Sequence, residues 1–278
     1  MNDPLPHPTV NERLIVDLLQ ELYRRFGLDY RNYSPTFLSR RITAYAKKSN
    51  LYSIEDLVQN LLENEKNLDV FIESFSLPTT RMFRDAELFQ LIRDTVIPLL
   101  DKKHLSKVWS AGCSTGEEAY SLAIVLKEEL PDRKVLTFAT DLSERSLHTA
   151  KKGIYQLRRM RAYTSGYQAG GGRAEFSNYY TADHENAMMN AELKTNIVFA
   201  QHNLVTDSTF NEFDLILCRN VLIYFNRSLQ EHVLNLLLES LRPGGILILG
   251  DKESIRSMSP RKDLLDIDRA YRIYQKTE

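Results

Sequence analysis

The feature that most constrains the fold of this chain is a strand, a glycine loop and a helix in direct succession. Residues 107–111 form a short apolar run, residues 112–116 are small and both begin and end with glycine, and residues 117–130 follow helical spacing. A second apolar run, 135–140, ends at Asp141. This succession is typical of the first half of a doubly wound nucleotide-type site.

Two carboxylates in this region indicate the kind of ligand. Asp141 is predicted at the carboxyl edge of a parallel sheet, where it can accept hydrogen bonds from ribose hydroxyls. Glu117 and Glu118 start the helix, where carboxylates suit the helix dipole but repel a phosphate. The loop therefore favours S-adenosylmethionine, which has an adenosine, a sulfonium and an amine but no phosphate. Glu117 is predicted to contact this ligand, and Glu118 is interpreted as a helix-terminal charge.

Composition narrows the class of protein. The chain has 278 residues, enough for a large α/β domain and a small second domain. A formal net charge of −1 gives no reason to expect nucleic acid as a partner. Two cysteines give no disulfide framework, and the histidines show no metal-ligand spacing. No apolar run approaches the roughly 20 residues of a membrane span. We expect a cytoplasmic protein without membrane insertion.

The chain divides into parts of different pattern. We expect a disordered leader at 1–10 that is not a signal peptide, an all-helical domain at 11–75, and a connector with a linking helix at 76–104. Residues 105–278 alternate strands with helices, which predicts an α/β domain with a doubly wound, mostly parallel sheet. Strand candidates are 107–111, 135–140, 196–201, 213–218, 246–250 and 270–275, and helix candidates are 117–130, 143–151 and 227–241.

Local signals set several boundaries. Gly27 is predicted to stop the first helix, and Ser53 with Asp56 to form a capping box. A linking helix is expected from Ala86 to Leu100, with its end near Pro98. Residues 241–245 are predicted to form a turn before the fifth strand. The last strand is expected to pair antiparallel at or near an edge.

An insertion at about 152–195 interrupts the α/β pattern. It is rich in glycine and tyrosine and lacks helical periodicity, so either a substrate-contacting segment or a surface loop fits it. Residues 151–173 carry six Lys or Arg and no acid, and residues 24–48 carry seven against one Asp. Such runs are either solvated faces or docking surfaces for an acidic partner.

Five motifs then appear in a recognisable order. They are TRMFRD at 80–85, AGCSTGEE at 111–118, ATD at 139–141, HNL at 202–204 and CRNVLIYF at 218–225. With them the chain resembles the chemotaxis receptor glutamate methyltransferases, the CheR family, over about residues 11 to 276. The resemblance implies a seven-stranded-type methyltransferase sheet after a small helical domain. It also implies S-adenosylmethionine as cofactor, S-adenosylhomocysteine as product, and glutamates on the cytoplasmic helical bundle of a methyl-accepting chemoreceptor as acceptors.

The resemblance also implies roles for single residues. Arg84 and Tyr224 would act at the point of methyl transfer. The donor-binding residues would be Thr80 and Arg84 from the connector, Glu117 for the amine, Asp141 for the ribose, Asn203 and Leu204 near the adenine, and Asn220 and Val221. Pro78 stands where some members have a polar donor-binding residue, which puts a contact from that position in doubt.

The implied reaction is chemically simple. A glutamate acceptor with a pKa of about 4.3 is already ionised at neutral pH, so no general base is required. Catalysis would rest on alignment of the reacting atoms. Two alternatives stay open: a non-catalytic module that binds S-adenosylmethionine and signals to a partner, and a nucleic-acid methyltransferase. Enzymes that methylate base amines typically place an Asp/Asn-Pro-Pro-aromatic segment where this chain has residues 218–222.

Overall fold

The chain folds into two compact units. The computed structural model describes residues 12–75, 80–101, 106–253, 255 and 262–277. One unit contains the residues up to 77 together with 223–232, and the other contains 78–222 and 233–278. The expected leader at 1–10 and Pro78 lie outside the described residues. In the part of the chain that is described, no helix combines the length and apolar composition needed to cross a membrane.

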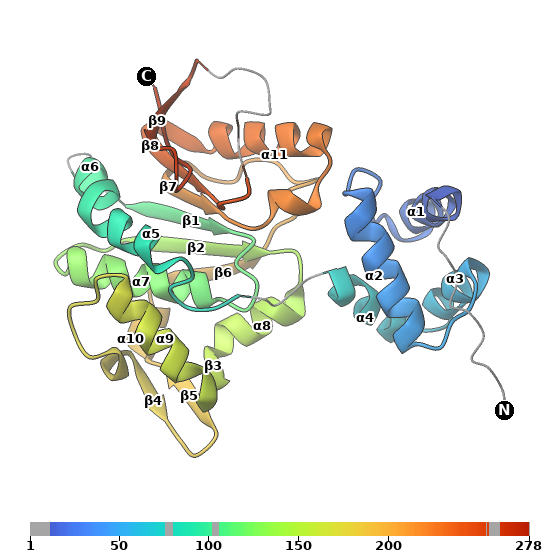
Figure 1. Cartoon of the computed structure of the whole chain (residues 1–278), viewed down its shortest axis with the longest axis horizontal. Helices are drawn as coiled ribbons and strands as arrows, with labels where there is room; N and C mark the ends of the chain where they lie inside the picture. Colours follow the sequence, from blue (N-terminus) through green and yellow to red (C-terminus); the bar gives the residue numbers. More distant parts are fainter. Residues whose placement is uncertain (1–11, 76–79, 102–105, 254, 256–261, 278) are drawn as a thin grey trace. The chain divides into compact units, whose positions relative to one another are not determined.

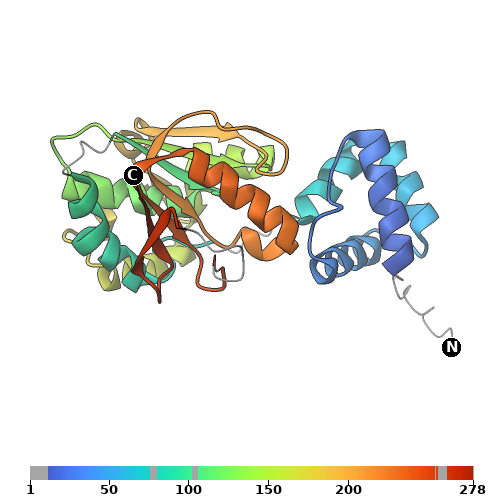
Figure 2. The same ribbon diagram turned by 90° about the horizontal axis from the view of Figure 1, so that it is seen from above.

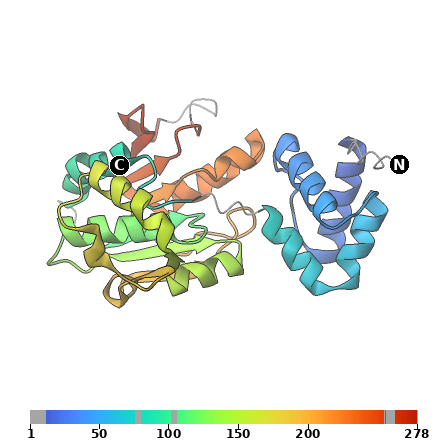
Figure 3. The ribbon, with the colours of Figure 1, turned by 60° about the horizontal axis from the view of Figure 1, so that its bottom comes forward.

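Four helices build the first unit, drawn in blue to cyan in Figure 1 and seen from two other sides in Figures 2 and 3. They are α1 (Glu12–Phe26), α2 (Pro35–Lys48), α3 (Ile54–Glu63) and α4 (Glu65–Phe75). Gly27, in the left-handed region, follows α1, and the predicted capping box of Ser53 and Asp56 starts α3. Both predicted helix boundaries are therefore confirmed.

Residues 223–232 pack with this helical unit. Tyr33 forms a β-bridge with Phe225, and the Ser34 N–H donates to the Tyr224 carbonyl at 2.8 Å. The ring of Tyr224 lies 4.6 Å from that of Phe37, centre to centre. A segment that follows the fourth parallel strand in the sequence thus completes the core of the helical unit.

The second unit is built on a seven-stranded sheet with the order β6-β2-β1-β7-β8-β10-β9 (Figure 1). The strands are β1 (Lys107–Ala111), β2 (Leu136–Asp141), β6 (Ile197–Gln201), β7 (Phe213–Cys218), β8 (Leu241–Leu249), β9 (Leu264–Asp268) and β10 (Ile273–Lys276). The first five in this order pair parallel, and β10 pairs antiparallel with β8 and β9. The predicted doubly wound sheet and its antiparallel last strand are confirmed.

Helices cover this sheet. They are α5 (Ala86–Leu91), α6 (Ile97–Asp101), α7 (Glu117–Glu129), α8 (Glu144–Lys152) and α11 (Arg227–Glu239). Alternate strand residues such as Val108, Leu215 and Ile246 join one core with apolar residues of α5, α6 and α7. All six residues of β7 are buried, as expected for a central parallel strand covered on both faces.

The structure shows two local irregularities, and one of them makes a predicted turn wrong. The linking helix predicted at 86–100 is present and ends at Asp101, but it contains a π-helical turn, Ile92–Val96, in which the Ile97 N–H donates to the Ile92 carbonyl five residues back. This wider turn suits a proline, which lacks an N–H and collides with the carbonyl four residues before it. Residues 241–245 do not precede the fifth strand but belong to β8, where the register with β7 shifts and Gly244 is left-handed.

The insertion contains helices and strands, although its sequence lacks helical periodicity. It contains β3 (Ile154–Gln156), α9 (Leu157–Ala169), the 3₁₀ turn Phe176–Tyr179, β4 (Tyr180–Ala182), β5 (Asn186–Met189) and α10 (Ala191–Lys194). The buried face of α9 consists of Met160, Tyr163 and Tyr167. The hydroxyl groups of the two tyrosines and the arginines near Met160 hide the apolar period in the sequence.

Candidate active site

Most of the predicted site residues follow the carboxyl ends of neighbouring parallel strands. Strands β6, β2, β1 and β7 lie side by side and run in the same direction (Figure 1). Their carboxyl ends therefore meet at one edge of the sheet. The loops that leave this edge carry residues 112–118, 141, 203–204 and 220–221, which gives the geometry of a ligand site in a doubly wound fold.

Asp141 ties two of these loops together. Its Oδ2 accepts a hydrogen bond from the Ser114 N–H at 2.8 Å, and its Oδ1 accepts one from the Ser143 N–H at 2.9 Å. Burial raises the pKa of this carboxyl group, and the backbone hydrogen bonds partly oppose that rise. The His202 N–H also donates to the Asp141 carbonyl at 3.3 Å, which brings the following Asn203 next to the same strand end.

The β1–α7 loop lies directly against the loop after β7. A Cβ added to Gly112, which has a φ of 74°, would lie 2.4 Å from Cγ2 of Val221. Ser114 and Asn220 also adopt left-handed backbone conformations that side chains disfavour. Strained residues at facing loops are typical of a functional site, and Gly112 is the residue that lets these two loops approach each other.

Glu117 starts α7 and is completely buried. Its Oε2 accepts a hydrogen bond from the Thr115 hydroxyl at 2.6 Å. Its Oε1 accepts one from Arg159 Nη1 at 3.1 Å and one from the Tyr163 hydroxyl at 3.3 Å. Burial raises the pKa of Glu117, although these donors oppose the shift. An anion at this position fits a cationic ligand group.

Arg84 lies in a connector that is clamped to the sheet edge. The Phe83 N–H donates to the Ser121 hydroxyl at 2.9 Å, and Arg219 Nη1 donates to the Arg84 carbonyl at 3.5 Å. Arg219 also donates to the carboxylate of Asp85, and both Phe83 and Asp85 are left-handed. The backbone at the half-buried Arg84 is therefore held on both sides.

Arg219 is a buried residue whose role the sequence did not reveal. Its side chain is 2% exposed, and its Nη1 donates to Oε2 of Glu118 at 3.1 Å. The other oxygen of Glu118 accepts from the Ser110 hydroxyl at 2.9 Å. Glu118 thus has protein partners for its charge, in agreement with its interpretation as a structural carboxylate.

Glu253 is a second residue that the sequence did not reveal. It is 3% exposed and follows β8. Its Oε2 accepts from the N–H groups of Gly250 at 2.6 Å and Asn220 at 2.9 Å, and its Oε1 accepts from the Val221 N–H at 2.8 Å. This carboxylate holds Asn220 and Val221, both expected to bind the donor, in place.

The other predicted residues are placed as follows. Leu204 is buried and Asn203 is half-buried, with its Oδ1 accepting from the Val205 N–H at 3.0 Å. Thr80 is half-buried at the start of the described connector. Tyr224 is half-buried against Phe37 in the helical unit.

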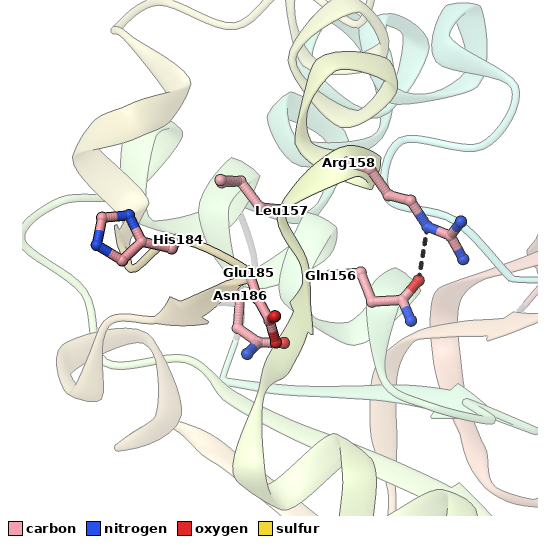
Figure 4. A pocket seen from close by; sticks show the side chains of 6 residues that line it. All are labelled: Gln156, Leu157, Arg158, His184, Glu185 and Asn186. Carbon is pink, nitrogen blue, oxygen red and sulfur yellow. Dashed lines mark hydrogen bonds between the residues drawn. The ribbon is translucent and has the colours of Figure 1, made fainter.

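Two other features supply no reacting group to this site. Burial raises the pKa of the Cys113 thiol, the opposite of what an activated nucleophile requires. A hollow of about 510 Å³ lies on the insertion, lined by Gln156, Leu157, Arg158, His184, Glu185 and Asn186 (Figure 4). None of the predicted site residues lines this hollow.

Comparison with known proteins identifies the family. Residues 15–76 match the CheR methyltransferase all-alpha domain, and residues 78–271 match the CheR methyltransferase SAM binding domain. The chain belongs to the CheR methyltransferase family. Its resemblance to this family, its seven-stranded fold and S-adenosylmethionine as its methyl donor, all predicted from the sequence, are confirmed.

Relatives of this CheR methyltransferase match most of its length. It is 42% identical to a Pseudomonas putida protein named Cher3, over 86% of this chain and 87% of the relative. It is 33% identical to the chemotaxis protein methyltransferase of Listeria innocua, over 84% of this chain and 86% of the relative. It is 28% identical to chemotaxis protein methyltransferase 1 of Vibrio cholerae, over 92% of this chain and 94% of the relative.

The raised pKa values give a pH test of the donor site. The predicted roles of Glu117 towards an ammonium and of Asp141 towards ribose hydroxyls favour the ionised carboxylates, and burial shifts protonation of both groups to higher pH. We expect the affinity for S-adenosylhomocysteine to fall as the pH is lowered from neutrality towards about 5, before ordinary carboxyl groups titrate. Calorimetry across this range measures the effect. The affinity of a Glu117→Gln variant for S-adenosylhomocysteine should depend less on pH. A wild-type affinity that stays constant down to pH about 4.5 would contradict the prediction.

Proposed function

We propose that this CheR methyltransferase transfers the methyl group of S-adenosylmethionine to glutamate side chains of a methyl-accepting chemoreceptor in the cytoplasm. The observation that carries the proposal is Arg84, a cation held in a clamped connector beside the carboxyl edge of the sheet. A cation at this position favours an acceptor group that is an anion, such as a carboxylate. Two of the relatives named above are chemotaxis protein methyltransferases, which supports a receptor as the protein that carries the acceptor.

The site supports this reaction without proton transfer by the protein. S-Adenosylmethionine, when bound, supplies a methyl group on a sulfonium, and an acceptor carboxylate displaces it so that a C–O bond forms as the S–C bond breaks. The products are a methyl ester and S-adenosylhomocysteine. Arg84 would orient the ionised acceptor, and Tyr224 would shape the point of transfer. Pairing with Arg84 must stay loose, because the developing ester loses its charge.

The basic face of α2 supports recognition of an acidic receptor bundle. Arg40 and Arg41 form no ion pair within the described residues, and Arg41 lies over the ring of Phe37 at 5.5 Å. Phe37 in turn contacts Tyr224, so the basic face and the proposed transfer residue share one cluster. The basic insertion is partly used internally, because Arg159 pairs with Glu117 and Arg173 pairs with Glu129. We therefore assign receptor attraction mainly to α2.

Transfer of labelled methyl from S-adenosylmethionine to receptor-containing membranes tests the proposed function. We expect label in the receptor that is released by mild base, as a carboxyl methyl ester requires. Tight donor binding without any transfer would favour a non-catalytic signalling module. Label in added RNA or DNA instead of the receptor would identify a nucleic-acid methyltransferase.

Reversing the charge of Arg40 and Arg41 to Glu is expected to raise the KM for receptor membranes about tenfold with a smaller change in kcat. The reason is that long-range attraction to an acidic helical surface is lost. Replacing Arg24 and Arg25 by Gln is the matched control, because Glu21 already pairs with both. Methylation kinetics at two salt concentrations check the result. Unchanged kinetics in the reversed variant would remove the basic face from the proposal.

A further inference from the structure

The carboxylate of Glu117 is fully enclosed, although a ligand amine is proposed to bind it. Its side chain is 0% exposed. Thr115 donates to one oxygen, and Arg159 and Tyr163 donate to the other. A ligand amine can therefore reach Glu117 only when one of these three donors moves aside.

Arg159 is the donor that can move. Tyr163 is buried in α9, and the loop carbonyl of Thr115 is held by the Tyr155 hydroxyl at 2.8 Å. The side chain of Arg159 is 44% exposed on a flexible stem. Both of its hydrogen bonds, to Glu117 and Tyr163, use Nη1. Within the described residues its Nε and Nη2 have no hydrogen-bond partner, so the guanidinium can turn to a second acceptor while it stays near Glu117.

We infer that Arg159 holds the α-carboxylate of the methyl donor while Glu117 holds its α-ammonium group. The inference rests on the proposed ligand role of Glu117. The ammonium and carboxylate of the donor are bonded to the same carbon atom, so an ammonium at Glu117 brings the carboxylate beside the arginine that pairs with Glu117 in this structure. The ion pair between Arg159 and Glu117 is then replaced by two charge-assisted pairs, one between Glu117 and the ammonium and one between Arg159 and the carboxylate. The planar guanidinium can bind that carboxylate through two N–H groups.

The placement of α9 keeps Arg159 at this position. A Cβ added to Gly166 would lie 3.1 Å from the Cβ of Phe83 and 3.3 Å from the Met82 carbonyl, so the helix backbone lies tightly on the connector. α9 also packs against α5, as Figure 3 shows. The insertion thus brings a cation to the donor end of the site, and the clamped connector supports it from the other side.

The inference makes Arg159 a specificity residue for the amino-acid end of the donor, which calorimetry of the full chain can test. The two ligands are S-adenosylhomocysteine and its decarboxylated analogue, which keeps the amine. We expect the wild type to prefer the ligand with the carboxylate. In Arg159→Met we expect a roughly tenfold loss of affinity for S-adenosylhomocysteine and little change for the analogue. Arg159→Lys, which keeps the charge without the fork, should recover part of the loss.

Arg158→Met is the matched control for Arg159. Arg158 is the preceding residue of α9, is exposed, and donates to the side chain of Gln156 at 2.9 Å. Its replacement should leave both affinities unchanged. If Arg159→Met loses equal affinity for both ligands, Arg159 only supports the structure of the site. If the variant gains affinity for S-adenosylhomocysteine, Arg159 only blocks access to Glu117. Either result overturns the inference. A wild type that binds neither ligand would overturn the donor site and with it the proposed function.

Discussion

Replacing Asp141 by alanine is expected to weaken binding of S-adenosylhomocysteine at least hundredfold. A carboxylate at this position can accept hydrogen bonds from both ribose hydroxyls, and each charge-assisted bond contributes about 1.5 kcal/mol, so losing both gives roughly this factor. The substitution also releases the Ser114 and Ser143 N–H groups that Asp141 holds, which loosens the loop between β1 and α7. Both effects act in the same direction.

Calorimetry with S-adenosylhomocysteine measures the loss directly. Asp183→Ala is the matched control, because the Asp183 carboxylate also accepts two backbone N–H groups, from Glu185 and Asn186, but lies between β4 and β5 in the insertion. That variant should bind the ligand normally. Asp141→Asn keeps one carbonyl oxygen, so its affinity for S-adenosylhomocysteine should lie between those of the wild type and Asp141→Ala. An affinity of Asp141→Ala within about threefold of the wild-type value would show that Asp141 organises the loops without holding the ribose.

The sequence located the edge of the sheet because the signals for it are local. A strand, a glycine loop and a helix occur within 107–130, and Asp141 directly ends the next strand. Such neighbours in sequence stay neighbours in space. The sequence did not reveal the π turn before Pro98 or the register shift at 241–245, where a residue that normally breaks an element is accommodated. Local propensity does not reveal such irregularities, because tertiary packing decides them.

The residues that support the site were missed because their partners are distant in sequence. Glu253 and Asn220 are 33 positions apart, Arg159 and Glu117 are 42 apart, and Arg219 and Glu118 are 101 apart. None of these pairs produces a period or a spacing in the chain. In a sequence, the carboxylate or guanidinium of such a pair resembles any surface charge until the fold is known, even where it lies within a motif as Arg219 does.

Of these supporting residues, Glu253 is expected to matter most for stability. Glu253→Ala leaves the N–H groups of Gly250, Asn220 and Val221 without their acceptor. Each unsatisfied buried donor costs about 1–3 kcal/mol, and water can reach part of the space left behind, so we expect the free energy of unfolding to fall by about 3–5 kcal/mol. The left-handed backbone of Asn220 also loses its anchor, and donor affinity should fall with stability.

Urea denaturation and calorimetry on the same preparations separate these two effects. Glu144→Ala, an exposed glutamate in the first turn of α8, is the control and should change the free energy of unfolding by less than about 0.5 kcal/mol. In Glu253→Gln one oxygen still accepts, while the amide NH₂ faces an N–H group, so stability should fall by an intermediate amount. Addition of S-adenosylhomocysteine at saturating concentration should raise the urea midpoint of Glu253→Ala less than that of wild type, because the ligand binds the loosened loop more weakly. An equal shift in both proteins would mean that Glu253 stabilises the fold and that Asn220 and Val221 keep their positions without it.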